Sequence, residues 1–169
     1  MLLETLQWKV LSPFVDETVA ALNKNLGLDV ESEAAFDESV KDFNFKGYAV
    51  VINTTGNVQG RILIHYYTET ALAIANCLLE KQSSATDAES GLDDEAVNVL
   101  ADFAHKIVAS SVKALEAGDV KVQVSPAYFI KDTQKIENLM QGVQEIITVP
   151  LRLEGAGRFY VNYLLNTAI

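Results

Sequence analysis

Residues 48–67 read YAVVINTTGNVQGRILIHYY and carry a strong strand–turn–strand pattern. Tyr48–Ile52 is rich in β-branched and aromatic residues, and residues 61–67 repeat that composition. Between them, residues 55–57 read Thr-Gly-Asn, which favours a turn. The pattern predicts a β-hairpin. Gly60, near the start of the second strand, indicates a bulge or a close approach of another backbone.

The segment before the hairpin predicts one helix and one weak strand. Ser12 suits the N-cap of a helix and Pro13 suits its first position. Apolar residues follow at helical spacing, and Gly27 is a natural stop. A strand over residues 28–36 is then expected to lead into the hairpin.

The segment after the hairpin predicts two helices. Thr68 can cap a short helix whose apolar residues recur at helical spacing. Residues 82–91 are polar and small, which indicates a loop. Acidic residues at 93–95 then begin the longest helix, because negative charge complements the helix dipole. This helix is expected to end at Gly118.

Three further strands are predicted over residues 120–130, 143–153 and 158–165, with Pro126 at an edge or bulge because it cannot donate to a ladder. A loop is expected between the first two, over residues 131–142. The order of elements is therefore an approximate repeat of one αβββ unit with a short helix between the copies. It predicts an α+β fold, with a mainly antiparallel sheet of about six strands and helices packed on one face.

The composition of the chain sets limits on its function. It has 169 residues, of which 49% are hydrophobic, so we expect a single domain over residues 1–169. Its formal net charge is −10, which disfavours nucleic acid and anionic membrane surfaces as partners. It has one cysteine, which precludes an internal disulfide. With neither a secretory leader nor a long apolar span, a cytoplasmic protein is expected.

The long helix carries the residues most suited to chemistry. At 100° per residue, one stripe is apolar and should face the sheet. It consists of Val97, Leu100, Ala104, Ile107, Val108, Ser111 and Leu115. An adjoining face carries Asn98, Asp102, His105 and Ala109. Asp102 and His105 are i,i+3 neighbours that can act together, and the small Ala109 leaves room for a partner.

Two other interpretations of this face have to be weighed. It can be an ordinary solvated surface with no chemical role. The acid and the histidine also have the spacing found in di-iron bundles, but such sites need further carboxylate-bearing helices, so no metal site is expected. Elsewhere, His65 alternates with Leu63 and Tyr67 in a strand and is interpreted as structural, and Cys77 as a buried apolar residue.

Several segments together resemble one known family, the CheC/CheX-type chemotaxis phosphatases, and most closely its CheX-like branch. The resemblance runs over nearly the whole chain. The segments are SPFVDETV at residues 12–19, GNVQGRILI at 56–64, ETALAIA at 69–75, VPL at 149–151 and GRFYV at 157–161. They resemble, in order, the first helix, a Gly-x-x-x-Gly hairpin, the middle helix and the last strands of that family.

The resemblance implies a site on the long helix. In that family this helix carries Glu-x-x-Asn, and a proline follows further along the chain. Here Asp102-x-x-His105 and Pro126 stand in those places. The family removes phosphate from the phospho-aspartate of the response regulator CheY. Its acidic residue engages a receiver lysine, and its asparagine orients the attacking water. By this resemblance Asp102 and His105 are catalytic, and Asn98 and Ala109 contact the partner.

The resemblance also implies partners and cofactors. The partner would be a phosphorylated, CheY-like receiver domain, and the chain would form a homodimer. No cofactor of its own is expected, since the Mg²⁺ would belong to the receiver. Some relatives carry a second site on the first helix. In this chain Leu11 and Phe14 stand there and neither can orient water, so at most one site is expected.

Two functions follow from the altered motif. A neutral imidazole has one donor and one acceptor nitrogen, so His105 can hold a water as a carboxamide does, and Asp102 keeps the acidic charge. This favours a phosphatase for receiver domains, in chemotaxis or related two-component signalling. Aspartate is one methylene shorter than glutamate, however, and the imidazole ring is bulkier than an amide. This favours a degenerate binding or dimerisation module without phosphatase activity.

Overall fold

The fold is seen in a computed structural model of the chain. It describes residues 6–43, 47–81, 94–118, 120–131, 139–155 and 157–166. The loop predicted over residues 82–91 lies outside the described residues, as does most of the loop predicted over 131–142.

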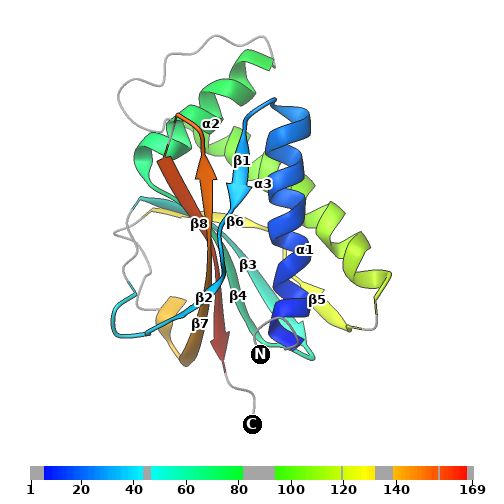
Figure 1. The fold of residues 1–169 in the computed structure, drawn as a ribbon. Coiled ribbons are helices and arrows are strands. Elements are labelled where there is room, and N and C mark those ends of the chain that lie inside the picture. The colour runs from blue at the N-terminus through cyan, green and yellow to red at the C-terminus, as the bar shows by residue number, and fades with distance from the viewer. Residues whose placement is uncertain are drawn as a thin grey trace.

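Within these residues the chain forms three α-helices, one π-helical turn and eight strands (Figure 1). The helices are α1 (Leu6–Ala20), α2 (Thr68–Lys81) and α3 (Asp94–Glu116), and the π-helical turn is Ala21–Asn25. The strands are β1 (Val30–Ser32), β2 (Phe36–Glu38), β3 (Tyr48–Gly56), β4 (Gly60–Tyr66), β5 (Val122–Val124), β6 (Tyr128–Lys131), β7 (Val143–Leu153) and β8 (Gly157–Asn166).

All eight strands belong to one antiparallel sheet. Its order is β1-β7-β8-β4-β3-β5, while β2 also pairs with β7 and β6 also pairs with β3. The two short strands β1 and β2 therefore lie one after the other along β7, and β5 and β6 do the same along β3. The six predicted strands are thus confirmed, with two of them broken in the middle. One break falls at Pro126, which cannot donate to the ladder.

The predicted repeat is visible in the topology. Each half consists of a long helix, a broken strand and a hairpin, and the hairpin strands β4 and β8 pair with each other at the centre of the sheet. The broken strand of each half pairs with the hairpin of the other: β1 and β2 with β7, and β5 and β6 with β3. This exchange ties both halves into one sheet.

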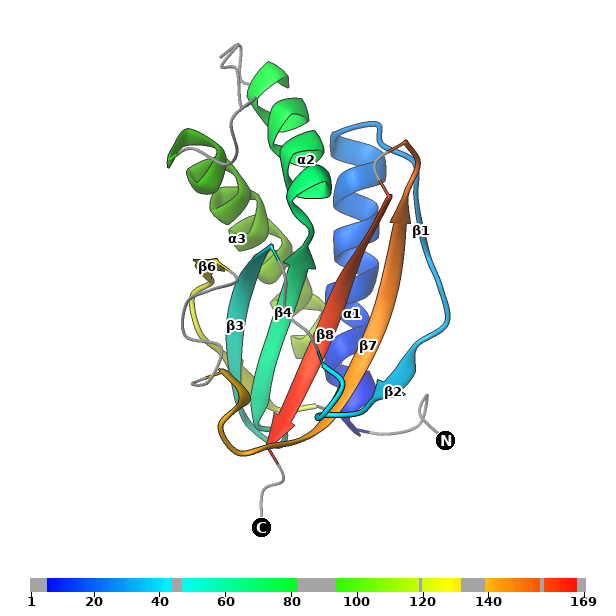
Figure 2. The same cartoon turned by 90° about the vertical axis from the view of Figure 1, so that its left-hand side faces the viewer.

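The three helices pack on one face of the sheet, as predicted (Figure 2). Alternate residues of the central strands, such as Val50 and Ile52 of β3, join the helices in the main hydrophobic core. The intervening residues, such as Ala49 and Val51, belong to a smaller cluster on the other face, against which Val40 and Phe43 pack. The central strands are therefore buried on both faces, although helices cover only one.

The start of α1 differs from the prediction. The helix begins at Leu6 rather than at Ser12, so that Pro13 lies inside it. Val10 and Leu11 explain the difference, because both are fully buried in the core and extend the helical spacing toward the N-terminus. Proline leaves the carbonyl four residues earlier, that of Lys9, without its helical donor. Lys9 is exposed, so water can replace that donor.

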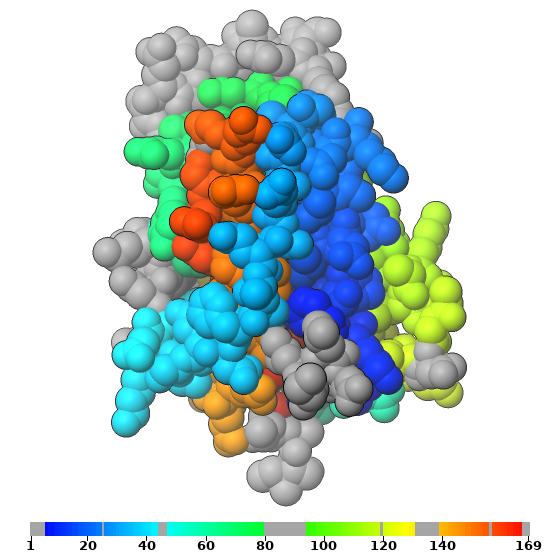
Figure 3. Space-filling view, viewed as in Figure 1, coloured from blue at the N-terminus to red at the C-terminus, as the bar shows by residue number. Residues whose placement is uncertain are grey.

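Other boundaries differ by a few residues. The hairpin is confirmed, but β3 extends to Gly56, so the turn follows the predicted position. The strand predicted over 28–36 appears as β1 and β2, and Figure 3 shows this segment on the surface beside β7. The close approach at Gly60 is confirmed, because a Cβ there would collide with the carbonyl oxygen of Leu164 on β8.

Candidate functional site

Helix α3 divides its residues between the core and the surface as predicted. Leu100, Ala104 and Ile107 are buried against the other elements. The predicted stripe is buried throughout, except that Val97 is half-buried. On the other side Asn98, Asp102, His105 and Ala109 are all exposed, and we call these four residues the α3 face. The structure therefore brings together all four predicted site residues.

His105 contacts the segment between β5 and β6. Its Nε2 lies 3.2 Å from the carbonyl oxygen of Ala127. A carbonyl only accepts hydrogen bonds, so Nε2 carries the proton and donates. In the neutral ring the other nitrogen, Nδ1, is then an acceptor with a free lone pair. The contact thus selects the tautomer in which His105 can accept a hydrogen bond from a water.

The segment that holds His105 is itself anchored to β3. The backbone N–H of Ser125 donates to the carbonyl of Asn53 at 2.9 Å. The N–H of Asn53 in turn donates to the Ser125 hydroxyl, also at 2.9 Å. The hydroxyl donates to the carbonyl of Pro126 at 3.0 Å. These bonds fix the backbone on both sides of Pro126 and so position the Ala127 carbonyl. Ala127 could not be predicted from the sequence, since any residue type supplies a carbonyl there.

Asp102 presents a carboxylate to solvent one helical turn before His105. Among the described residues it has neither an ion pair nor a hydrogen bond to its side chain. Its negative charge is therefore available to a cation from outside the chain. Together the two side chains offer a carboxylate for a cationic group and an imidazole nitrogen for a water.

The α3 face continues toward the C-terminal end of the helix into a hollow that the prediction missed. Val112 and Glu116 follow Ala109 at helical spacing and line it, together with Val120 and Lys121. The hollow has a volume of about 560 Å³. The helical spacing of residues 109, 112 and 116 could have predicted one wall of the hollow. The opposite wall, formed by the residues before β5, could not be predicted in this way.

The two residues of α1 at the places of a second site are both in the core. Leu11 and Phe14 are fully buried. Within the described part of α1, neither position therefore reaches the surface. His65 is also buried, with 3% of its surface exposed. Cys77 is half-buried rather than buried, and its thiol lies 3.7 Å from the Leu26 carbonyl.

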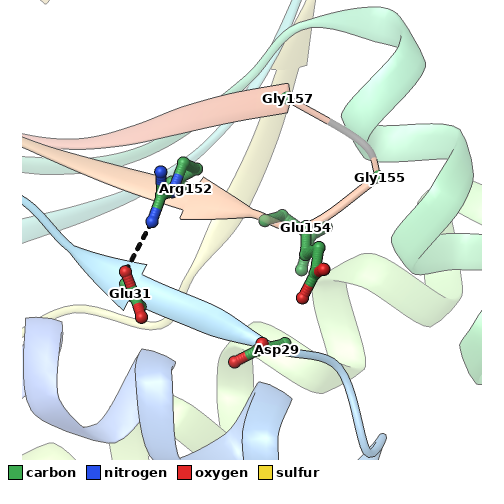
Figure 4. A pocket seen from close by; sticks show the side chains of 7 residues that line it. Asp29, Glu31, Arg152, Glu154, Gly155 and Gly157 are labelled. Atoms are coloured by element: carbon green, nitrogen blue, oxygen red, sulfur yellow. Dashed lines mark hydrogen bonds and ion pairs between the residues drawn. The ribbon is translucent and has the colours of Figure 1, made fainter.

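A second hollow lies where β1 meets the turn between β7 and β8 (Figure 4). Arg152 and Glu31 form an ion pair at 2.6 Å across it. The pKa of Glu154 is raised, because its carboxyl shares a hydrogen bond with Asp29 and is repelled by that neighbour. The charged groups around this hollow interact mainly with one another. Among the described residues, moreover, no group of three His, Cys, Asp or Glu side chains is placed to hold a metal ion.

None of the helices, as far as the structure describes them, is long and apolar enough to cross a membrane.

Comparison with protein-family models gives no match, and comparison with curated proteins gives none. Solved structures do match over nearly the whole chain. The chemotaxis protein CheX from Desulfovibrio desulfuricans is 17% identical, with a TM-score of 0.68 over 92% of this chain and 98% of that one. A CheC-like superfamily protein from Shewanella sp. PV-4 is 12% identical, with a TM-score of 0.71 over 92% and 96%.

A third similar structure is a complex. The CheX–CheY–BeF₃–Mg²⁺ complex from Borrelia burgdorferi contains a chain that is 23% identical to this one, with a TM-score of 0.69. The match covers 92% of this chain and 97% of the other. These likenesses show that the chain has the fold of CheX and CheC-like chemotaxis proteins, which confirms the fold that the resemblance predicted.

Proposed function

We propose that this chain hydrolyses the phospho-aspartate of a CheY-like receiver domain at the α3 face. The observation that carries the proposal is the pairing of exposed Asp102 with His105, whose tautomer is set by the Ala127 carbonyl. The fold supports it, since a structure of the same fold is a CheX–CheY complex containing BeF₃ and Mg²⁺. The altered motif is the point at which the proposal departs from the family pattern.

In the proposed reaction His105 holds the attacking water. Nδ1 accepts a hydrogen bond from the water, while Nε2 remains bound to Ala127. The water oxygen forms a bond to phosphorus, and the bond between phosphorus and the aspartate oxygen breaks. The electron pair leaves with the receiver carboxylate, and the water protons pass to the phosphate and solvent. Catalysis by positioning suits this chemistry, because phosphoryl transfer needs little covalent help from the protein.

Asp102 would bind the receiver rather than the water. Its exposed carboxylate has the charge needed to pair with the lysine that the family resemblance implies beside the receiver phosphate. The Mg²⁺ would also come from the receiver. Asn98 and Ala109 lie on either side of the pair on the same face, so they would contact the docked partner. We further propose that the protein acts in the cytoplasm as a homodimer.

A second function is favoured by the same two side chains. Aspartate reaches less far than glutamate, and the His105 ring is tied to Ala127 rather than free to enter a partner. An error of about 1 Å in position can cost 10²-fold in rate. The alternative proposal is therefore a binding or dimerisation module that retains the fold and lacks phosphatase activity.

Phosphate release from purified phospho-receivers separates the two functions. The full chain is added in catalytic amount to several phosphorylated receivers, and binding to each is measured in parallel with a non-hydrolysable BeF₃ adduct. A phosphatase shortens the lifetime of at least one receiver that it binds, after spontaneous hydrolysis is subtracted. If the chain binds receivers but leaves the phosphate lifetime unchanged in every case, the phosphatase proposal is contradicted and the binding module is supported.

A further inference from the structure

The face of the sheet that lacks helices carries a small hollow, of about 210 Å³. Strand β2 runs along β7 with Phe36 opposite Thr148, and the chain then turns at Ser39. The carbonyl of Ser39 accepts from the N–H groups of Asp42 and Phe43, at 3.1 and 3.0 Å. This turn brings Asp42 and Phe43 into the lining of the hollow, and Phe43 packs against the smaller hydrophobic cluster on the face away from the helices. Strand residues thus form the floor of the hollow, and the hydrogen-bonded turn forms one wall.

A buried amide in the lining lacks one hydrogen-bond partner. Asn162 is 1% exposed, and its Nδ2 donates to the Thr148 hydroxyl oxygen at 2.9 Å. That hydroxyl has one proton and donates it to the carboxylate of Glu38 at 2.6 Å. It can therefore only accept from Asn162, which fixes the orientation of the amide. The Oδ1 of Asn162 has no hydrogen-bond partner. The missing partner must be a donor, because a carbonyl oxygen only accepts.

Aromatic rings form much of the remaining lining. Tyr67 and Tyr160 lie with ring centroids 5.9 Å apart, edge to face. His65 lies 5.7 Å from Tyr67 and 6.2 Å from Tyr160, and Phe43 lies 6.4 Å from His65. Phe36 and Tyr67 are respectively 45% and 42% exposed, although both are large hydrophobic side chains. The faces of such rings attract cations through their quadrupoles.

The charged side chains among the described residues that line the hollow are acidic. Glu38 and Asp42 contribute carboxylates, and no lysine or arginine is among the described residues that line the hollow. The chain as a whole carries a formal charge of −10. An anion would be repelled here, whereas a cation would find two carboxylates, aromatic faces and the unpaired oxygen of Asn162.

We propose that this hollow binds a compact organic cation of the guanidinium or alkylammonium class. Its N–H groups would donate to Asn162 Oδ1 and to the carboxylates, and its flat or methylene surface would pack on the tyrosine rings. The hollow, at about 210 Å³, is large enough for a headgroup of this size. The site is separate from the α3 face, so either proposal can fail without the other.

The direct test is a titration of the ¹⁵N-labelled full chain with agmatine, followed by NMR. We expect saturable shifts centred on the backbone amides of Thr148, Tyr160 and Asn162. Tetramethylammonium, which lacks N–H donors, should bind several-fold more weakly. Glutarate, a dianion of similar length, should cause no saturable shift. The absence of saturable shifts with agmatine at millimolar concentration would overturn the proposal, as would equal binding of glutarate.

Variants locate the binding. The double substitution Glu38→Gln and Asp42→Asn should weaken agmatine binding at least tenfold. The control is Asp37→Asn, which removes one negative charge from an exposed position of β2 outside the lining and should leave affinity unchanged. Asn162→Leu should abolish binding while raising the melting temperature, because it removes the unpaired oxygen. Unchanged affinity in the double variant contradicts the proposal, whether or not Asn162→Leu folds.

Discussion

At the scale of single residues, the most informative position is His105. The Ala127 carbonyl takes the Nε2 proton and leaves Nδ1 as the acceptor, so one backbone atom decides what the imidazole can do. A carboxamide at this position would have its own donor and acceptor but a shorter reach. The two side chains therefore place a water differently, and substitution at this position distinguishes an adapted site from a degenerate one.

We predict that His105→Asn retains or raises phosphate release from a receiver, because it restores the carboxamide of the family pattern. His105→Ala should lower the rate by about 10²-fold, the loss that a misplacement of about 1 Å can cause. Both are measured as initial rates of phosphate release at equal receiver occupancy. Equal rates for wild type and His105→Ala would show that the imidazole does not act in the reaction.

Gly60 is the second informative residue, and its role is structural. A Cβ there would collide with the Leu164 carbonyl on β8, in the middle of the sheet. Gly60→Ala should therefore lower the free energy of unfolding by about 1–3 kcal/mol, the range for overpacking a core. Urea unfolding followed by circular dichroism measures this. Gly155→Ala is a poor control because Gly155 has a φ of 83°. At Gly118 a Cβ would meet only the Leu115 carbonyl oxygen, at an ordinary contact distance of 3.6 Å, so Gly118→Ala should change stability far less.

At the scale of elements, α3 is the most important, because it carries all four residues of the proposed site. Its hydrophobic spacing predicted most of the residues that face the core, although Ala96, Val99 and Phe103 are also buried and were not predicted. The four residues predicted on the adjoining face are exposed, because a regular helix keeps its register over many turns. The start of α1 was less predictable: the proline signal pointed to Ser12, and the burial of Val10 and Leu11 outweighed it. The breaks in the strands could not be predicted either, since β1 and β2 pair with β7, which lies far away in the sequence.

We predict that Ala109→Arg blocks receiver binding through the bulk of its side chain on the exposed α3 face. The fold should be unaffected, because position 109 contributes nothing to the core. Binding of a BeF₃-activated receiver by calorimetry is the measurement, with Asp16→Arg on the exposed side of α1 as the matched control. Full affinity in Ala109→Arg would place the interface elsewhere.

At the scale of the whole molecule, the exchanged strands give the sheet two broken edges. β1 and β2 form one, and β5 and β6 form the other. Short, interrupted edges discourage uncontrolled pairing with other chains, whereas a defined dimer can still add strands at an edge. The exchange was not predictable from local sequence, because each broken strand pairs with the hairpin of the other half.

The homodimer remains a prediction at this scale. Sedimentation equilibrium at micromolar concentration should give twice the monomer mass. A single monomeric species across that range would contradict the homodimer without affecting the chemistry proposed for α3.

We propose above that the α3 face removes phosphate from a receiver domain, and a comparison of three proteins tests that proposal. Phosphate release from a receiver that the chain demonstrably binds is measured for wild type, Asp102→Ala and the control Asp16→Ala, which removes an exposed acid from α1. We expect wild type and Asp16→Ala to accelerate phosphate release. Asp102→Ala should lose at least about tenfold of this rate, as expected when a charged contact worth roughly 1.5–3 kcal/mol is removed. Equal acceleration by Asp102→Ala and wild type would show that Asp102 takes no part in phosphate release.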